Sequence, residues 1–268
     1  MLQKISEAKI SKIKKEFISS MNKHFGKNLC FAFNSGRVAF RVIEFKKSDF
    51  DIAIVLSDSI FRDPPKFLTA KRKFMEDYFI IHKKFKLVPD YMWPGEYLTL
   101  SHLEDAVRGR CFELVNGRIN LPYLKINEEL YGDRLYRYWW GMLCFSEFLA
   151  GDFTKYIKLK KESLETLFKF LFYKFGQINK AQSFEQIFEN IAVDIRFLGI
   201  RKEFLAEYYK MVLPYVNEIL HNLIRSNLII KTTDGYAPTK KIKQWAKEIK
   251  KKISDKKWNS ELNKLYYL

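Results

Sequence analysis

The sequence predicts an α+β fold, with a mixed-sheet α/β domain at residues 1–130 followed by a helical domain at residues 131–268. Three observations lead to this prediction. Short apolar runs typical of strands alternate with amphipathic segments up to about residue 90. From about residue 133, apolar residues recur at helical spacing over long stretches. Near the C-terminus the order becomes helix, strand, turn, strand and helix.

The first domain is predicted to begin with a helix and two buried strands. Residues 1–24 carry apolar side chains at helical spacing, which predicts an amphipathic helix. The aromatic-rich run 29–33 ends at Asn34-Ser35-Gly36, so we expect a buried strand stopped by a turn. Residues 48–56 predict a second buried strand, with two carboxylates at its start.

A second helix and a third strand are expected to complete this domain. Asp63 suits a helix N-cap and is followed by two prolines, which are favoured in a first helical turn. The helix is predicted over residues 66–83. The apolar run 85–90 predicts a third strand that ends at Asp90.

The second domain is predicted to be a helical bundle. Three helical stretches each end near a glycine, as helix C-termini often do: Gly151, Gly176 and Gly199. Asn116-Gly117 indicates a hairpin turn ahead of a domain boundary near 125–132. The element order within residues 204–250 predicts a winged-helix-like hairpin, and the segment 240–257 is rich in lysine.

The charge balance favours a polyanionic partner. The chain has 48 Lys and Arg residues against 31 Asp and Glu residues, for a net charge of +17, which attracts nucleic acids and nucleotides. The three cysteines lack metal-ligand spacing, so we expect neither a disulfide scaffold nor a structural zinc site. No apolar stretch reaches the length of a membrane span, and we expect a cytoplasmic protein with no membrane partner.

Asp49 and Asp51 are the sharpest chemical feature of the sequence. Residues two apart on a strand point to the same face, and two adjacent carboxylates repel unless a cation lies between them. Mg²⁺ prefers such oxygen ligands and binds them together with substrate phosphates. Asp90 is the third candidate, and Ser35-Gly36 offers a hydroxyl and backbone N–H groups to phosphate. The alternative is structural, because these residues also suit ordinary turns.

The segment FNSGRVAFRVIEFKKSDFDIAIVL resembles the nucleotidyltransferase superfamily with the DNA polymerase beta-like fold. The family signature is Gly-Ser at a strand end, a spacer, and Asp-x-Asp opening the next strand. The resemblance covers about residues 29–90. It implies that Asp49, Asp51 and Asp90 are catalytic and bind two Mg²⁺ ions. It also implies that Ser35 and Gly36 hold the nucleoside triphosphate.

Two positions qualify this resemblance. Asn34 stands where the family usually has Gly, so we expect the backbone to approach phosphate less closely there. Asp90 has two acidic neighbours in the sequence, Asp77 and Glu96, that compete for the role of third carboxylate.

The implied activity is transfer of a nucleoside monophosphate from an NTP to an acceptor hydroxyl. The positive charge and the winged-helix-like hairpin favour a tRNA-like RNA as acceptor. One alternative is a small, antibiotic-type acceptor, as in the resistance enzymes of this family. Another is a non-catalytic nucleic-acid-binding protein on the same fold. Arg108, Arg110 and Arg118 flank the expected hairpin and are further candidates for phosphate contact.

Overall fold

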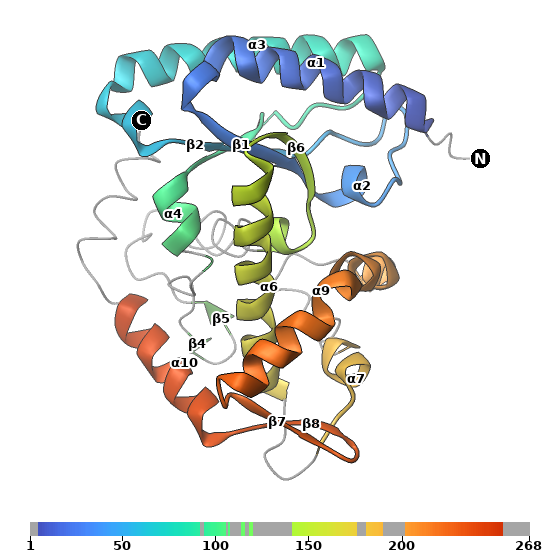
Figure 1. Cartoon of the computed structure of the whole chain (residues 1–268). Helices are drawn as coiled ribbons and strands as arrows, with labels where there is room; N and C mark the ends of the chain where they lie inside the picture. Colours follow the sequence, from blue (N-terminus) through green and yellow to red (C-terminus); the bar gives the residue numbers. More distant parts are fainter. Residues whose placement is uncertain are drawn as a thin grey trace. The chain divides into compact units, whose positions relative to one another are not determined.

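The computed structural model describes residues 5–91, 94–105, 107, 114–115, 118–119, 141–175, 181–189 and 202–253 (Figure 1). The chain divides into two units. The first comprises the described residues of Met1–Leu103 and Phe145–Ile157, and the second those of Glu104–Cys144 and Lys158–Ser260. Helices and a mixed sheet are both present, so the α+β class is confirmed. The domain boundary predicted near 125–132 lies outside the described residues.

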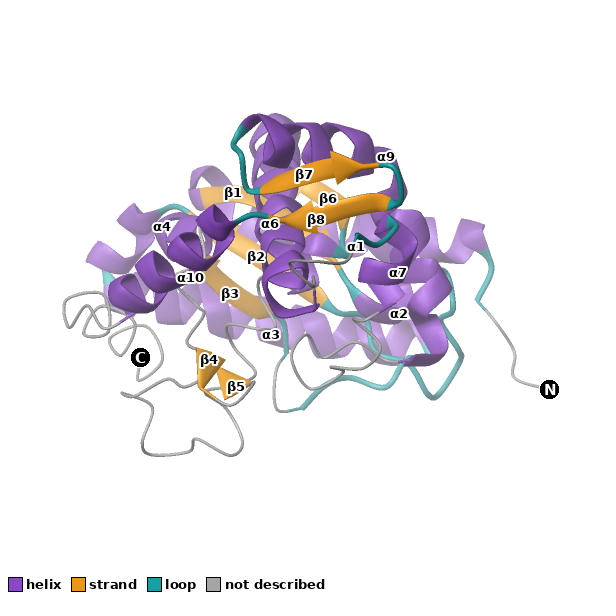
Figure 2. Cartoon of the chain, turned by 90° about the horizontal axis from the view of Figure 1, so that it is seen from below, coloured by secondary structure: helices purple, strands orange, loops and turns teal. Residues whose placement is uncertain are grey.

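A four-stranded mixed sheet in the order β3-β2-β1-β6 forms the centre of the first unit (Figure 2). Strand β1 (Leu29–Asn34) pairs antiparallel with β2 (Ile52–Leu56) on one side and with β6 (Glu147–Gly151) on the other. Strand β3 (Glu96–Thr99) runs parallel to β2. The two strands predicted around the Ser35-Gly36 turn are therefore adjacent in the sheet.

Helices α1 (Glu7–Phe25) and α3 (Pro64–Phe85) lie side by side on one face of this sheet (Figure 1). Each begins at a capping residue, of which Asp63 was predicted. The Ser6 hydroxyl accepts a hydrogen bond from the Lys9 N–H, and the Asp63 carboxylate caps α3. Both predicted helices are confirmed, with α3 extending two residues beyond the expected end at 83.

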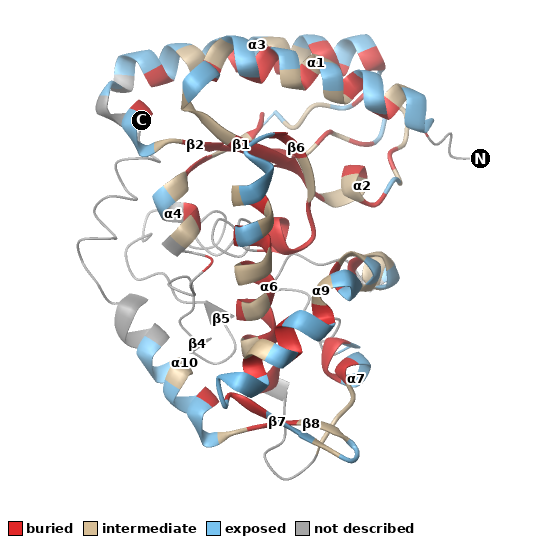
Figure 3. Cartoon of the chain, in the orientation of Figure 1, coloured by how far each residue is buried: buried red, intermediate tan, exposed pale blue. Residues whose placement is uncertain are grey.

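The core of the first unit lies between these two helices and the sheet, and Figure 3 marks buried residues on both helices and along the strands. Phe17 of α1 and Phe50, just ahead of β2, are fully buried and stack with ring centroids 5.0 Å apart. Burial of one such side chain contributes about 2–3 kcal/mol. The aromatic packing therefore fixes the segment that enters β2.

The prediction of a strand at residues 85–90 is wrong. α3 continues to Phe85 and stops at Lys86, whose backbone is left-handed with φ 57°. The following residues bond to a turn rather than to β2, because the Val88 N–H donates to the Ser48 carbonyl at 3.0 Å. Pro89 also lacks the N–H that a strand ladder needs. The strand that pairs with β2 comes later in the chain, as β3.

The expected helix ending at Gly151 is also partly wrong. Residues 141–144 are helical, but Glu147–Gly151 forms β6 and pairs with β1. Gly151 has φ +89°, and a Cβ there would lie 2.5 Å from the Cys30 carbonyl oxygen, so only glycine fits against β1. The tertiary pairing with β1 overrides the helical spacing of the sequence.

Four helices occupy most of the described part of the second unit. They are α6 (Phe153–Phe175), whose first residues belong to the first unit, α7 (Phe184–Glu189), α9 (Leu205–Arg225) and α10 (Lys240–Ile253). Within the second unit Phe168 of α6 packs on Phe184 of α7 with ring centroids 4.7 Å apart. No helix within the described residues is long and apolar enough to cross a membrane.

The C-terminal hairpin predicted from the Asp-Gly turn is present. Strands β7 (Ile229–Thr232) and β8 (Gly235–Pro238) pair antiparallel. A third stretch joins them at Gln182, which exchanges two backbone hydrogen bonds of 3.1 and 2.8 Å with Tyr236. This bridge ties the segment between α6 and α7 to the hairpin.

The remaining described elements are short. They are η1 (Gly26–Asn28), α2 (Gly36–Ala39), η2 (Asp58–Arg62), α4 (Leu100–Asp105), β4 (Leu114–Val115), β5 (Arg118–Ile119) and η6 (Lys202–Phe204). Strands β4 and β5 pair antiparallel and flank the predicted Asn116-Gly117 turn, which itself lies outside the described residues. The expected helix ends at Gly176 and Gly199 lie outside them too.

Candidate active site at the start of strand β2

The Asp49-x-Asp51 segment enters the sheet with its two acidic residues on the face opposite α1 and α3. Phe50 and Ile52 belong to the core that those helices cover. Side chains alternate along an extended chain, so Asp49 and Asp51 are placed on the other face. Both are partly buried. The predicted shared orientation of the pair agrees with this packing.

Gly36 lies directly against the Asp51 carboxylate. Its backbone has φ +58°, and an added Cβ would be only 2.5 Å from Asp51 Oδ2. Ser35, which is buried, precedes it at the N-cap of α2. The fold therefore brings Ser35-Gly36 and Asp51 together, as the resemblance implies, and it leaves no room for a side chain at position 36.

Asn34 does not fill the space beside Asp51. It pairs with Ile52 across the antiparallel ladder, and directly opposed residues share a face, so its side chain lies on the helix-covered side. Its amide nitrogen donates to the Asp51 carbonyl at 3.4 Å. Its fully buried amide oxygen has no hydrogen-bond partner among the described residues. Glycine is required at position 36, where a Cβ would meet the Asp51 carboxylate. The presence of Asn rather than Gly at position 34 does not affect that contact.

Tyr78 of α3 is linked to all three predicted acids, by one hydrogen bond and by electrostatics. Its hydroxyl oxygen accepts a hydrogen bond from the Asp90 N–H at 3.2 Å. Burial raises the pKa of Tyr78 well above its usual range, and the negative charges of Asp49, Asp51 and Asp90 raise it further, against the lowering effect of that hydrogen bond. All three carboxylates therefore lie within electrostatic reach of one phenol.

Glu96 is a candidate site residue that the sequence reasoning did not assign. It opens β3 and pairs with Ala53 in the parallel ladder, so it shares the sheet face of Asp51. Burial and the nearby Asp90 charge raise the pKa of Glu96 to about 7, against the opposing effect of Lys71. The sequence signal for Glu96 is an acid at the start of the strand that pairs with β2. Because residues 85–90 were predicted to be that strand, Asp90 was assigned in its place.

Asp77, the other competing acid, is engaged elsewhere. Its carboxylate accepts hydrogen bonds from the Ser20 hydroxyl and contacts the His24 ring nitrogen, both at 2.8 Å. These contacts join α3 to α1. Asp77 therefore serves helix packing, which leaves Asp90 and Glu96 as the candidates for the third carboxylate.

Hydrogen bonds hold the segment that carries the acids. The buried Ser48 hydroxyl accepts from the Glu44 N–H at 3.0 Å and from the Arg37 guanidinium at 3.3 Å. The Ser48 carbonyl accepts from Val88. These bonds connect the turn before Asp49 both to α2 and to the chain that leads to Asp90. The segment that carries Asp49 is thus tied to α2, to the turn at Glu44 and to the chain that leads to Asp90.

The donor chemistry of this site suits a hard divalent cation. Asp49, Asp51, Asp90 and Glu96 supply only oxygen ligands, which Mg²⁺ prefers. Across the part of the chain that the structure describes, however, no three His, Cys, Asp or Glu side chains gather closely enough to hold a metal ion. The residues fit Mg²⁺ in ligand type, and Asp49 and Asp51 are the two carboxylates that would bind the ion.

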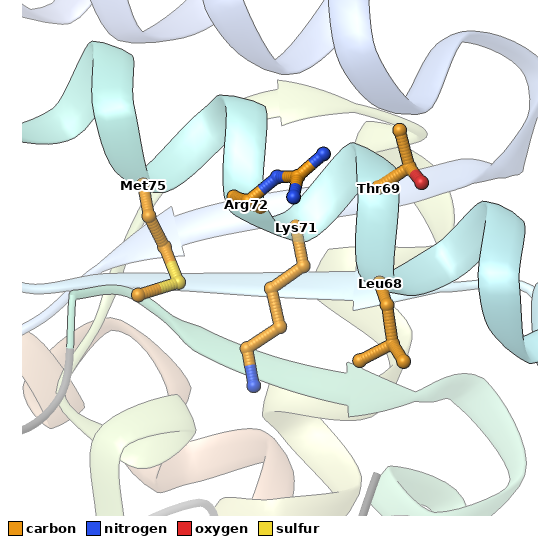
Figure 4. A pocket seen from close by; sticks show the side chains of 5 residues that line it. All are labelled: Leu68, Thr69, Lys71, Arg72 and Met75. Atoms are coloured by element: carbon orange, nitrogen blue, oxygen red, sulfur yellow. The ribbon is translucent and has the colours of Figure 1, made fainter.

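A separate pocket of about 330 Å³ runs along α3 and is lined by Leu68, Thr69, Lys71, Arg72 and Met75 (Figure 4). Figure 4 shows Leu68, Lys71 and Met75 extending from the same side of the helix. The Lys71 ammonium lies 5.2 Å from the Tyr97 ring centroid, and burial lowers the pKa of Lys71 against the opposing charge of Glu96. Asp49, Asp51 and Asp90 do not line this pocket.

The arginines that the sequence offered as phosphate contacts cannot be placed in this site. Arg108 and Arg110 lie outside the described residues, and only the backbone of Arg118 is described, in β5. Comparison of the chain with protein-family models, with curated protein sequences and with solved structures finds no match.

Proposed function

We propose that the protein is a metal-dependent nucleotidyltransferase that moves a nucleoside monophosphate from an NTP to an acceptor hydroxyl. The observation that carries this proposal is the close approach of Gly36 to the Asp51 carboxylate. It occurs where the strand that ends in Ser35-Gly36 meets the strand that Asp49-x-Asp51 opens. A carboxylate beside a glycine turn is the arrangement that a triphosphate with bound cations requires.

Each residue has a defined part in the proposed reaction. Asp49 and Asp51 would hold Mg²⁺, with Asp90 as the third carboxylate and Glu96 beside it. Bound Mg²⁺ supplies charge that lowers the pKa of an acceptor hydroxyl and offsets the charge on departing pyrophosphate. Ser35 and Gly36 would orient the triphosphate through the hydroxyl and backbone N–H groups. Partial burial of the acids strengthens these electrostatic interactions.

The C-terminal elements support RNA as the acceptor. The order of elements along this part of the chain is that of a winged-helix module. It runs α6, the Gln182 bridge, α7, α9 and the hairpin β7–β8. Helix α10 comes next, and its exposed residues include four lysines: Lys240, Lys241, Lys243 and Lys247. A helix face of this kind attracts a phosphate backbone. A polycationic small acceptor such as an aminoglycoside is disfavoured by the net charge of +17.

The proposal is tested by incubating the protein with Mg²⁺ and each α-labelled NTP, with total cellular RNA or a panel of small hydroxylated molecules as acceptors. We expect label on RNA with at least one NTP. Label on a small molecule alone would favour the antibiotic-type alternative. Asp49→Asn and Asp51→Asn should abolish labelling and keep the fold. Transfer by the folded double variant would contradict the assignment.

A second candidate is a nucleic-acid-binding protein that uses this fold without catalysis. The specific observation in its favour is that no three metal-ligating side chains gather within the described residues. A thermal shift experiment separates the two functions, because a ligand that binds only the folded state raises Tm. The catalytic proposal predicts a rise in Tm with at least one NTP and Mg²⁺ together. No rise with any NTP would favour the second candidate.

A further inference from the structure

We propose that Tyr78 and His82, one turn apart on α3, are positioning residues that set the geometry of the acidic site. This inference rests on the proposed function. The two side chains hold different segments: Tyr78 holds the backbone at Asp90, and His82 holds the backbone at Phe50, between Asp49 and Asp51. One helix therefore controls how the third carboxylate lies relative to the other two.

The hydrogen bonds of His82 define its tautomer. Its Nδ1 lies 2.8 Å from the Tyr78 carbonyl oxygen, which can only accept, so Nδ1 carries the proton. Its Nε2 is then free of a proton and accepts the Phe50 N–H at 3.2 Å. The ring is completely buried. A neutral imidazole thus bonds the peptide that joins the two acids at the entrance to β2.

Tyr78 holds a second segment, the backbone at Asp90, in a similar way. Its oxygen accepts the Asp90 N–H, so its own proton is directed away from that bond. The three carboxylates that act on this hydroxyl are those of Asp49, Asp51 and Asp90. The Tyr78 hydroxyl thus anchors the backbone at Asp90 to α3.

The two rings are themselves held rigidly. Tyr78 and His82 lie with ring centroids 4.0 Å apart, and Phe17 of α1 contacts both at 5.9 and 5.7 Å. Burying a hydroxyl and an imidazole costs free energy that an apolar pair would not. Phe and Leu would fill this core equally well, so the polar atoms are explained by the bonds that they make to the acidic segments.

The first test compares Tyr78→Phe with the matched control Tyr156→Phe. Tyr156 is also buried, and its hydroxyl donates to the Ser146 carbonyl at 2.9 Å, on a side chain that packs against Phe31. Both variants lose one buried hydroxyl and keep the ring. Mn²⁺ binding is measured by the loss of its free electron paramagnetic resonance signal. We expect Tyr78→Phe to weaken Mn²⁺ binding about tenfold and Tyr156→Phe to leave it unchanged.

Kinetics supply a second readout with the acceptor found by the transfer assay. We expect Tyr78→Phe to lower kcat about tenfold with little change in KM for the NTP, because Ser35 and Gly36 remain intact. For His82, His82→Leu removes the acceptor of the Phe50 N–H, while His82→Gln supplies an amide oxygen. His82→Gln should retain more Mn²⁺ binding and more transfer than His82→Leu.

The outcomes separate this inference from the function on which it rests. If the wild-type protein neither binds Mn²⁺ nor transfers a nucleotide, the proposed function fails and the inference fails with it. If the wild type does both and Tyr78→Phe behaves like Tyr156→Phe, the inference alone is overturned. Should Tyr78→Phe not fold, the His82 pair decides, and equal Mn²⁺ binding by His82→Gln and His82→Leu would overturn it.

Discussion

At the residue scale, the site depends on which backbone position can approach a carboxylate. Asn34 stands where the resemblance leads us to expect glycine, yet its side chain lies on the face opposite the Asp51 side chain and donates to the Asp51 carbonyl. Gly36 carries the steric constraint instead, because it combines φ +58° with the contact to Asp51. The glycine that the contact with Asp51 requires is therefore at position 36, two residues after Asn34.

Substitution of Gly36 by Ala should displace Asp51. Gly26→Ala is the matched control, since Gly26 has φ +46° but no atom within 4 Å of an added Cβ. Both substitutions place Ala at a positive φ, at a cost of about 1 kcal/mol or more. Urea unfolding should show a larger loss for Gly36→Ala, and only that variant should lose Mn²⁺ binding. Equal behaviour of the two variants would contradict the contact.

The pH dependence of stability should carry a contribution from His82. Burial lowers the pKa of His82 to about 4, against 6.5 in an unfolded chain. Between these values the unfolded chain binds a proton that the folded protein does not, so stability falls as the pH drops from about 6.5 to about 4. The loss reaches about 3 kcal/mol. It is absent above pH 6.5.

The His82→Gln variant isolates this contribution, because glutamine does not titrate. Unfolding free energies of the two proteins, measured from pH 4 to pH 7.5, should diverge at the acidic end, with the wild type losing more. Parallel curves would show that the fold does not lower the pKa of His82, which conflicts with the burial of its ring and with its bond to the Phe50 N–H.

At the scale of elements, two segments converge on Glu147 at the start of β6. Its carboxylate accepts two bonds from Arg41, at 2.7 and 2.6 Å, and one from Lys14 of α1 at 2.7 Å. Burial raises the pKa of Glu147, but the bonds from Arg41 and Lys14 outweigh burial, and the pKa is lowered overall. This edge strand is therefore fixed to α1 and to the turn after α2.

Loss of that charge should destabilise the first unit. Glu147→Gln leaves Arg41 and Lys14 without their shared carboxylate, and we expect a loss of about 2 kcal/mol in urea unfolding at pH 7. The control is Glu7→Gln, because Glu7 also contacts Arg41, at 3.3 Å, but its side chain is 69% exposed. It should cost less than about 0.5 kcal/mol. Similar losses would mean that β6 does not depend on this network.

Sequence patterns predicted the local elements of this unit better than its pairing. Capping residues and helical spacing located α1 and α3, and apolar runs located β1 and β2. They misplaced the third strand and missed β6, because pairing across more than a hundred residues with β1 has no local signature. Glu96 was named only as a competitor of Asp90 for the same reason: its place on the sheet face of Asp51 follows from the register of β3, not from spacing.

At the scale of the whole molecule, the net charge of +17 favours the polyanionic partner that we propose, and helix α10 carries four exposed lysines among its described residues. Acidic residues are few there, with Glu248 the acid of its described exposed face. RNA binding through this face depends on release of counterions, so the affinity should fall steeply as the salt concentration rises.

Charge removal on α10 tests this localisation. We expect simultaneous replacement of Lys240, Lys241, Lys243 and Lys247 by Gln to weaken RNA binding and to reduce the salt slope by about 3. The matched control removes four exposed lysines of the N-terminal segment: Lys12, Lys15, Lys23 and Lys27. It changes the net charge equally. If both variants lose the same affinity, the attraction is a property of the total charge and not of α10.

The central claim is that the acidic pair at the start of β2 holds divalent cations beside a nucleotide. Its most direct test is an anomalous difference map from crystals grown with Mn²⁺ and a non-hydrolysable NTP analogue. We expect a Mn²⁺ peak between the carboxylates of Asp49 and Asp51, with analogue phosphates next to Ser35 and Gly36. Bound analogue with Mn²⁺ peaks only elsewhere, or no peak at these residues, would contradict it.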